Sequence, residues 1–226
     1  MSNTRIYFFG CSFTALEASP TEYDFINYRE IIKEKTGHET SNRSHTGKSN
    51  QEILNDVYKV ATGFKNIDKR PVLVIQTTFL DRLGMYFDLR EEFISMCKRE
   101  NPDNFTEKIL IDFYNDWLKY FYSRNNAKLE FEKQIDFLCA WLRENKIKFV
   151  LVGMDESLDL IDNKTFFEKN NFVKFEKNYS FYSYAIYNKL RIADILSENV
   201  NQDFHFNQKG HDILADAIIE KLKSIT

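Results

Sequence analysis

Three short polar segments of the sequence carry side chains that can act together in acyl chemistry. The first follows an apolar run near the N-terminal end and reads Gly10-Cys11-Ser12-Phe13-Thr14. Gly10 allows a sharp turn, and Ser12 then stands near the start of the next element, where backbone N–H groups can stabilise an oxyanion. On its own, the segment fits a serine that only caps a helix at least as well.

The second segment, near the C-terminal end, places a carboxylate beside an imidazole. Asp203 and His205 lie two residues apart in a predicted loop before the last helix. A histidine acts as general base toward a serine hydroxyl when a third group orients its ring. In the alternative interpretation, His205 is a surface residue and Asn207 caps the helix. His211, one turn into that helix, is expected to be structural.

The same histidines also allow a mononuclear metal site made of Asp203, His205, His211 and His45. No His-x-x-x-His or Cys-x-x-Cys spacing supports such a site, so the sequence predicts no metal and no cofactor.

The third segment is the polar stretch between residues 42 and 50. Gly47 can bring a backbone N–H close to a substrate oxygen. The run Gly47-Lys48-Ser49 is similar to the end of a phosphate-binding loop, but Asn42 occupies the place of the upstream glycine that such a loop needs. ATP binding is therefore not predicted.

All three segments lie at the ends of predicted strands or the starts of predicted helices. Apolar runs predict strands over Arg5–Phe9, Pro71–Gln76 and Lys148–Gly153, and the polar segment Glu39–Arg43 is a candidate for a further strand. Helical spacing and capping residues predict helices over Thr21–Lys35, Ser49–Thr62, Phe105–Tyr122, Lys128–Glu144, Ala185–Glu198 and Asn207–Ser224. Alternating strands and helices favour an α/β fold with a parallel sheet covered on both faces. Ligands of such sheets bind where the strands end.

The middle of the chain is predicted to be helical from Met85 to Asn145, with a break near Asn101-Pro102-Asp103. The pattern between Met154 and Asn201 is ambiguous and rich in aromatic residues.

Length and composition set the class of protein. A chain of 226 residues with 43% hydrophobic and 29% charged residues, 7 Gly and 3 Pro fits a single domain over residues 1–226. A net charge of −3 gives no long-range attraction to nucleic acid or to anionic membranes. Cys11, Cys97 and Cys139 have no paired spacing, which favours reduced thiols. The apolar run Ile6–Phe9 is too short for a signal peptide or a membrane span, so a cytoplasmic protein is expected.

Taken together, the segments resemble the SGNH/GDSL hydrolase superfamily. The shared features are a strand ending in Gly-x-Ser-Phe-Thr, a glycine-bearing loop after the second strand, and an Asp-x-His-x-Asn-x-x-Gly-His segment near the C-terminal end. The resemblance implies a flavodoxin-like three-layer α/β/α sandwich with about five parallel strands. It also implies that Ser12 is the nucleophile, that Asp203 and His205 complete a catalytic triad, and that the N–H groups of Ser12 and Gly47 form an oxyanion hole. A helical insertion over residues 84–147 and an aromatic region over 155–201 lie outside the resemblance.

The segment after the third strand departs from the family pattern. The family has Gly-x-Asn-Asp there, and its asparagine completes the oxyanion hole; this chain has Gln76-Thr77-Thr78-Phe79-Leu80-Asp81-Arg82. Thr78 or Gln76 is expected to replace the missing donor. Gln76, Arg82 and Asn50 are predicted to contact substrate.

The sequence therefore predicts serine-dependent hydrolysis of a carboxylic ester, with an O-acetyl or short acyl group on a carbohydrate or similar small molecule as substrate. Two alternatives stay open. The same residues serve an acyltransferase, and a hydrolase scaffold that has lost activity serves as a glycan-binding or partner-binding protein, with the aromatic segments Phe113–Tyr122 and Phe172–Tyr187 as its surface. The middle helices are compatible with a homodimer.

Overall fold

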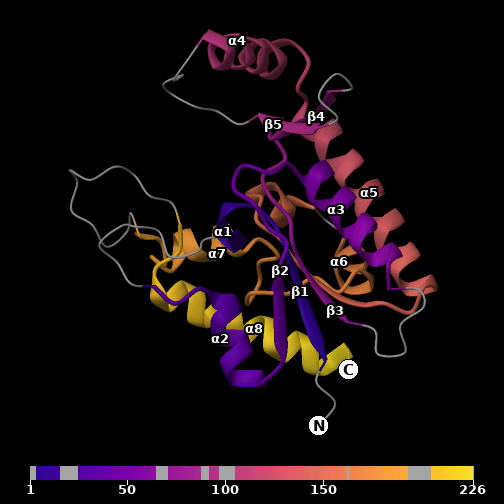
Figure 1. Ribbon diagram of the computed structural model, residues 1–226. Coiled ribbons are helices and arrows are strands. Elements are labelled where there is room, and N and C mark those ends of the chain that lie inside the picture. Colours follow the sequence, from indigo (N-terminus) through magenta and orange to yellow (C-terminus); the bar gives the residue numbers. More distant parts are fainter. Residues whose placement is uncertain are drawn as a thin grey trace.

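A parallel sheet of four strands runs through the middle of the molecule in the order β2-β1-β3-β6 (Figure 1). The strands are β1 (Arg5–Phe9), β2 (Glu39–Asn42), β3 (Val72–Gln76) and β6 (Lys148–Val152). All five residues of β3 are buried, as expected of a central strand covered on both faces. This computed structural model describes residues 4–15, 25–64, 71–87, 92–96, 105–161, 163–192 and 205–225, with the side chains of 83–110 left aside.

Helices cover both faces of the sheet. One face carries α2 (Tyr28–Thr36) and α8 (Gln208–Ile225), and the other carries α3 (Asn50–Thr62) and α5 (Arg124–Glu144) (Figure 1). The remaining described helices are α1 (Ser12–Ala15), α4 (Phe105–Tyr120), α6 (Lys164–Lys169), α7 (Phe181–Tyr187) and the 3-10 helix η1 (Glu156–Leu160). This arrangement confirms the predicted α/β fold with helices on both faces of a parallel sheet.

The fifth strand position is filled by an irregular segment instead of a regular strand. Two isolated parallel bridges, Leu151 with Phe172 and Gly153 with Ser180, lie on the outer edge of β6. The segment between the bridges contains a tight turn, in which Phe175 and Asn178 pair with each other. The family expectation of about five strands is therefore met by four strands and two bridges among the described residues.

The predicted helical stretch from Met85 is wrong at its start. Residues Leu83–Phe87 and Glu92–Met96 form the antiparallel strands β4 and β5, which pair in register from Leu83 with Met96 to Phe87 with Glu92. Apolar residues at 83, 85 and 87 alternate with a period of two, which is the spacing of a strand. The predicted insertion over residues 84–147 thus begins with a hairpin and continues with α4 and α5 (Figure 1).

Two predicted helices differ from the structure by more than four residues at one end. The helix predicted from Thr21 begins at Tyr28, because Asn27 has extended backbone angles and its side chain accepts a hydrogen bond from the Arg29 N–H; residues 21–24 lie outside the described part. The helix predicted over 185–198 is instead α7, which ends at Tyr187, and Lys189 follows with a left-handed φ of 54°. Residues 193–200 lie outside the described part.

The strand and cap predictions that locate the candidate site are confirmed. Ser49 caps α3 and its hydroxyl accepts a hydrogen bond from the Glu52 N–H, as the capping-box spacing indicated. Cys11 and Cys139 are buried free thiols, and burial raises the pKa of Cys139 to about 12. Cys97 lies outside the described residues.

Candidate active site at the carboxyl edge of the sheet

Ser12 stands where β1 ends and α1 begins, at the edge of the sheet to which the strands point their carboxyl ends. Gly10 makes this turn possible, because a Cβ at that position would lie 2.9 Å from Thr14 Cβ and 3.1 Å from Gln76 Cβ. Any larger residue would push α1 away from the end of β3. The Ser12 hydroxyl is partly exposed and makes no hydrogen bond to any other described residue.

A series of buried hydrogen bonds holds α1 against the end of β3 and the start of α2. Tyr28 donates to the Thr14 hydroxyl at 2.8 Å, and Thr14 donates in turn to the side-chain carbonyl of Gln76. The Gln76 amide group completes the chain by donating to Cys11 Sγ at 3.6 Å. Burial raises the pKa of Tyr28, so its hydroxyl keeps its proton and serves as the donor.

Gln76 therefore has a different place from the one predicted. Its side chain is completely buried, and both ends of its amide are bound to α1 and the turn before it. Because its amide is hydrogen-bonded to Thr14 and to Cys11, Gln76 is committed to holding α1. Cys11, expected to pack rather than react, is also completely buried.

The segment after β1 runs beside the segment after β3, so Ser12 and Thr78 lie at the same edge of the sheet. Phe9 pairs with Ile75, Cys11 contacts Gln76, and the rings of Phe13 and Phe79 lie 6.2 Å apart. Ser12 lies between Cys11 and Phe13 in the first segment, and Thr77 and Thr78 lie between Gln76 and Phe79 in the second. Thr78 Oγ1 is buried and has no hydrogen-bond partner among the described residues. A buried hydroxyl without a partner can still donate a hydrogen bond to a ligand.

Asn50 holds the backbone of Thr78. Its side-chain carbonyl accepts from the Thr78 N–H at 2.7 Å, and its amide group donates to the Thr78 carbonyl at 2.9 Å. Asn50 is the first residue of α3 and is 8% exposed. Both ends of its side chain are thus committed to the protein, which leaves Thr78 with its hydroxyl, not its N–H, to offer to a ligand.

The polar loop after β2 follows the edge of β1 past its end. The Arg43 N–H donates to the Phe8 carbonyl at 2.8 Å, and the His45 N–H donates to the Gly10 carbonyl at 3.3 Å. Gly47 has a left-handed φ of 81°, and its N–H makes no hydrogen bond to any other described residue. Lys48 is buried and forms an ion pair with Asp56, so its charge is not available to a phosphate.

Arg82 lies at the side of this loop. Its guanidinium donates to the Lys48 carbonyl at 3.3 Å and lies 5.5 Å from the centre of the Phe79 ring. The half-buried Arg82 thus joins the loop after β3 to the loop after β2.

His205 reaches the same edge from the other end of the chain. Its ring lies 4.8 Å, centre to centre, from the ring of Phe13, the residue next to Ser12. The His205 carbonyl accepts from the Ile192 N–H at 2.8 Å. Asn207, whose side chain caps α8 by accepting from the Gly210 N–H at 3.0 Å, also donates to the Lys189 carbonyl at 3.3 Å.

Asp203, the predicted carboxylate of the triad, lies outside the described residues, so its role as the group that orients His205 stays a prediction. Gly210 is explained by packing, because a Cβ there would lie 2.8 Å from the Leu190 carbonyl oxygen. His211 is buried against Tyr28 and Phe206, and burial lowers its pKa to about 4. This agrees with the structural role expected of His211.

The sequence did not reveal the hydrogen bonds that link Tyr28 through Thr14 to Gln76. Thr14 and Gln76 lie 62 residues apart, and nothing in their spacing reveals the contact. The one available signal was Gln76 itself, a polar residue that ends a fully apolar strand and needs partners when buried. A second missed residue is Asp155 after β6, whose buried carboxylate accepts from the Leu80 N–H at 2.7 Å and from the Ser157 N–H at 2.7 Å.

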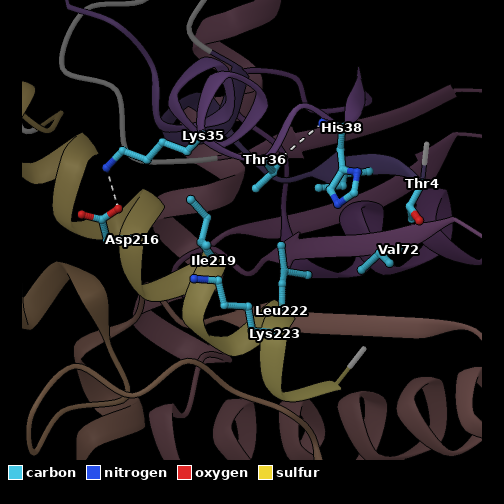
Figure 2. Close-up of a pocket in the computed structure, with 10 residues that line it drawn as sticks. Thr4, Lys35, Thr36, His38, Val72, Asp216, Ile219, Leu222 and Lys223 are labelled. Carbon is cyan, nitrogen blue, oxygen red and sulfur yellow. Dashed lines mark hydrogen bonds and ion pairs between the residues drawn. The ribbon is translucent and has the colours of Figure 1, made fainter. Parts of the chain in front are cut away.

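A cavity of about 410 Å³ lies at the opposite, amino edge of the sheet (Figure 2). Figure 2 shows Lys35 and Asp216 facing each other beside it, with Ile219 and Leu222 nearby. None of the predicted site residues lines this cavity.

In the part of the chain that the structure describes, no three His, Cys, Asp or Glu side chains gather into a group able to hold a metal ion. Within the same residues, no helix combines the length and the apolar character that a membrane span requires.

Comparison with known proteins identifies the fold. No protein-family model matches the chain, and no curated protein matches it in sequence. LAE5, an alpha/beta hydrolase enzyme from the metagenome of Lake Arreo, Spain, aligns with 99% of this chain and 96% of its own, at 10% identity and a TM-score of 0.54.

A catalytic mutant of Axe2, an acetylxylan esterase from Geobacillus stearothermophilus, aligns with 98% of this chain and 94% of its own, at 14% identity and a TM-score of 0.50. A lipolytic protein of the G-D-S-L family from Desulfitobacterium hafniense DCB-2 aligns over 97% and 99%, at 13% identity and a TM-score of 0.44. The chain shares the α/β fold of LAE5 and of the acetylxylan esterase Axe2. At these identities the likeness concerns the fold alone.

Proposed function

We propose that this protein is a serine esterase that hydrolyses a small carboxylic ester, with an acetyl or short acyl group on a carbohydrate or similar alcohol. One observation carries the proposal: the ring of His205 lies 4.8 Å from the ring of Phe13, the residue that follows Ser12, although His205 and Phe13 come from opposite ends of the chain. Acyl transfer needs a nucleophile and a base at one site, and this contact places the residue after Ser12 against the His205 ring.

In the proposed mechanism, Ser12 Oγ attacks the ester carbonyl while His205 takes the serine proton. The tetrahedral intermediate expels the alcohol, to which His205 returns the proton, and an acyl-serine remains. Water then attacks the acyl group with His205 again as base, which releases the acid and restores Ser12. Asp203 has the proposed role of holding the imidazole in the required tautomer.

We assign the oxyanion hole to three donors: the N–H groups of Ser12 and Gly47, and the hydroxyl of Thr78. The absence of other partners for the Gly47 N–H and Thr78 Oγ1 among the described residues supports this assignment. Thr78 thereby replaces the asparagine that the family uses. Removing one such donor from an enzyme typically lowers kcat by about 10²–10³-fold.

Asn50 and Gln76 have positioning roles in this proposal. Asn50 holds the Thr78 backbone, and Gln76 holds α1 through Thr14. Arg82 keeps its proposed contact with substrate, because it is half-buried at the edge of the site.

The experiment is a fluorophosphonate probe, which labels activated serines, followed by mapping of the labelled peptide. We expect label on Ser12, loss of the label in Ser12→Ala and His205→Gln, and retention in Ser224→Ala, a control on the exposed end of α8. Turnover of p-nitrophenyl acetate should fall at least ~10⁴-fold in Ser12→Ala. Equal turnover by the wild type and Ser12→Ala would exclude the proposal.

The same experiment separates the two alternatives. An acyltransferase gives the Ser12 label but transfers the acyl group to an added sugar, which product analysis with and without acceptor detects. A protein that only binds its ligand gives neither label nor turnover. Hydrolysis is favoured over the second alternative because the Ser12 hydroxyl has kept no structural partner among the described residues.

A further inference from the structure

A second cavity, of about 140 Å³, lies beside the candidate active site. Its walls come from the first turn of α3, the loop after β3, the end of α4 and the first half of α5. The α4–α5 part belongs to the insertion, which the sequence resemblance did not cover. Pockets for drug-sized ligands have about 300–1,000 Å³, so this cavity fits a single small ring.

One side chain connects the cavity to the proposed oxyanion hole. Asn50 lines the cavity, and its amide holds the N–H and the carbonyl of Thr78 at 2.7 and 2.9 Å. Arg82, from the same loop as Thr78, lines the cavity too. A group that extends from an ester bound at Ser12 therefore has this cavity as its neighbour.

The walls combine aromatic faces with uncommitted amides. The rings of Trp117 and Tyr122 contact each other with centres 5.1 Å apart and planes at 53°, and Phe131 is buried behind them. Gln51 and Gln134 are exposed, and neither makes a hydrogen bond to another described residue. Aromatic faces stack on the C–H faces of sugar rings, and side-chain amides donate to and accept from ring hydroxyls.

The charges near the cavity favour an uncharged ligand. Arg82 and Glu130 both line the cavity, so one positive and one negative side chain border it, and Glu130 pairs with Lys133 at 2.8 Å. Burial raises the pKa of Tyr122 to about 12, with Asp155 and Asp81 contributing in the same direction. Glu130 is the carboxylate that lines the cavity, and it would repel an anionic ring bound there.

We propose that this cavity is a subsite that binds one neutral, polyhydroxylated ring by stacking on Trp117 and Tyr122 and hydrogen bonding to Gln51 and Gln134. The inference rests on the proposed function in one respect: the bound ring is the alcohol part of the ester that Ser12 attacks. It adds to that function a recognition site formed by the insertion.

Binding is tested first, without reference to catalysis. The chain has two tryptophans, and Trp141→Phe leaves Trp117 as the only tryptophan reporter. We expect a saturable fluorescence change with methyl β-xylopyranoside or methyl β-glucopyranoside, with a Kd of about 1 mM, and at least fivefold weaker binding of the anionic methyl β-glucuronide.

Two variants identify the site, and a third is their matched control. In the Trp141→Phe background, Tyr122→Ala and Gln134→Ala should each weaken binding at least fivefold. Phe121→Ala removes a neighbouring aromatic that is 77% exposed and does not line the cavity, and it should leave Kd within twofold. No saturable change, equal affinity for the glucuronide, or equal losses in all three variants would overturn the subsite.

Kinetics then link the subsite to the ester. Gln134→Ala should lower kcat/KM at least fivefold more for an acetylated methyl xyloside than for p-nitrophenyl acetate, which has no sugar ring. If glycosides bind but Ser12→Ala does not change ester turnover, the proposed function fails and the binding site remains. If turnover depends on Ser12 but Gln134→Ala affects both esters equally, the subsite proposal fails and the esterase remains.

Discussion

The two edges of the sheet differ in a way that cavity size does not reveal. The amino edge holds the cavity of about 410 Å³, with an apolar floor that includes Ile6 and Val72 and with one exposed ion pair between Lys35 and Asp216 (Figure 2). The carboxyl edge holds the smaller cavity of about 140 Å³, but it also holds buried polar side chains. Those side chains are Thr14, Ser49, Asn50, Gln76, Thr77, Thr78, Asp155 and Ser157.

The buried polar side chains, and not the size of the cavity, indicate which edge of the sheet carries the functional site. Burying a polar side chain costs free energy unless its hydrogen bonds are satisfied. At the carboxyl edge these groups hold one another and the turn that carries Ser12, and Thr78 Oγ1 is buried without a partner among the described residues. Removal of groups at the two edges should therefore have unequal effects on activity and on stability.

Among the variants that compare the two edges, the largest effect is expected from Thr78→Val, which keeps the shape of the side chain and removes its hydroxyl. Loss of an oxyanion donor should lower kcat on p-nitrophenyl acetate by about 10²–10³-fold while KM changes little. Thr77→Val is the matched control, because the Thr77 hydroxyl donates to the Val152 carbonyl at 3.2 Å and is assigned no part in catalysis. Similar activity losses in both variants would show that Thr78 acts only through the fold.

His211 should make stability depend on pH. Burial lowers its pKa to about 4 from an ordinary value of 6.5, so between these values the unfolded chain binds a proton that the folded chain does not. The neutral His211 contributes about 3 kcal/mol to the free energy of unfolding. This contribution is complete above about pH 6.5 and is lost as the pH falls toward 4. Urea unfolding at pH 7 and pH 5 should show a smaller difference for His211→Phe than for the wild type.

The control for this pH dependence comes from the amino edge. His38→Gln, beside the larger cavity, should keep the wild-type difference between pH 7 and pH 5, because His38 is only partly buried. If His211→Phe and His38→Gln reduce the difference equally, burial of His211 is not its cause.

Gly10→Ala should destabilise the protein by about 1–3 kcal/mol, the usual range for overpacking a buried site. Its new methyl group would meet Thr14 and the end of β3 at 2.9 and 3.1 Å, so ester turnover should fall as α1 shifts. Gly63→Ala, at the end of α3, meets a carbonyl oxygen only at 3.3 Å and has an αR backbone. Thermal unfolding should place Gly63→Ala within about 0.5 kcal/mol of the wild type; an equal loss at Gly10 and Gly63 would contradict the packing argument.

The smallest effect is expected at the amino edge. Asp216→Asn breaks the Lys35–Asp216 pair, whose side chains are 46% and 63% exposed. Exposed pairs contribute little, so the free energy of unfolding should change by no more than about 0.5 kcal/mol and activity should not change. A large loss of activity would place a functional site at the amino edge and reverse the comparison.

The sequence predicted the sheet well because three of its four strands, β1, β3 and β6, are short apolar runs with clear ends. The strand Arg5–Phe9 was predicted with its observed bounds, and the strand from Pro71 begins one residue later, at Val72. The capping box of Ser49 likewise depends on residues three apart, a spacing visible in any sequence. These are local features, and local features are what a single sequence records.

The parts that were wrong depend on distant contacts. The hairpin of β4 and β5 was predicted as part of a long helical stretch, but its strands pair residues as far apart in the sequence as Leu83 and Met96. Gln76 was predicted to meet substrate, but a residue 62 positions away, Thr14, binds its amide. Asn50 was also predicted to contact substrate, and its hydrogen bonds to Thr78, 28 residues away, could not be read from the sequence.

The irregular segment beside β6 has a consequence for how the molecule avoids self-association. An unpaired strand edge is a template on which another chain can add a strand. Here the Leu151 N–H donates to the Asn171 carbonyl at 3.1 Å, the Leu151 carbonyl accepts from the Val173 N–H at 2.8 Å, and the Gly153 carbonyl accepts from the Phe181 N–H at 2.8 Å.

The opposite edge, β2, is only four residues long and reads Glu-Thr-Ser-Asn, which gives an incoming strand little length and no apolar face to bind. Both borders of the sheet are thus protected against strand addition and amyloid-type aggregation, one by bridging backbone and the other by brevity and polarity.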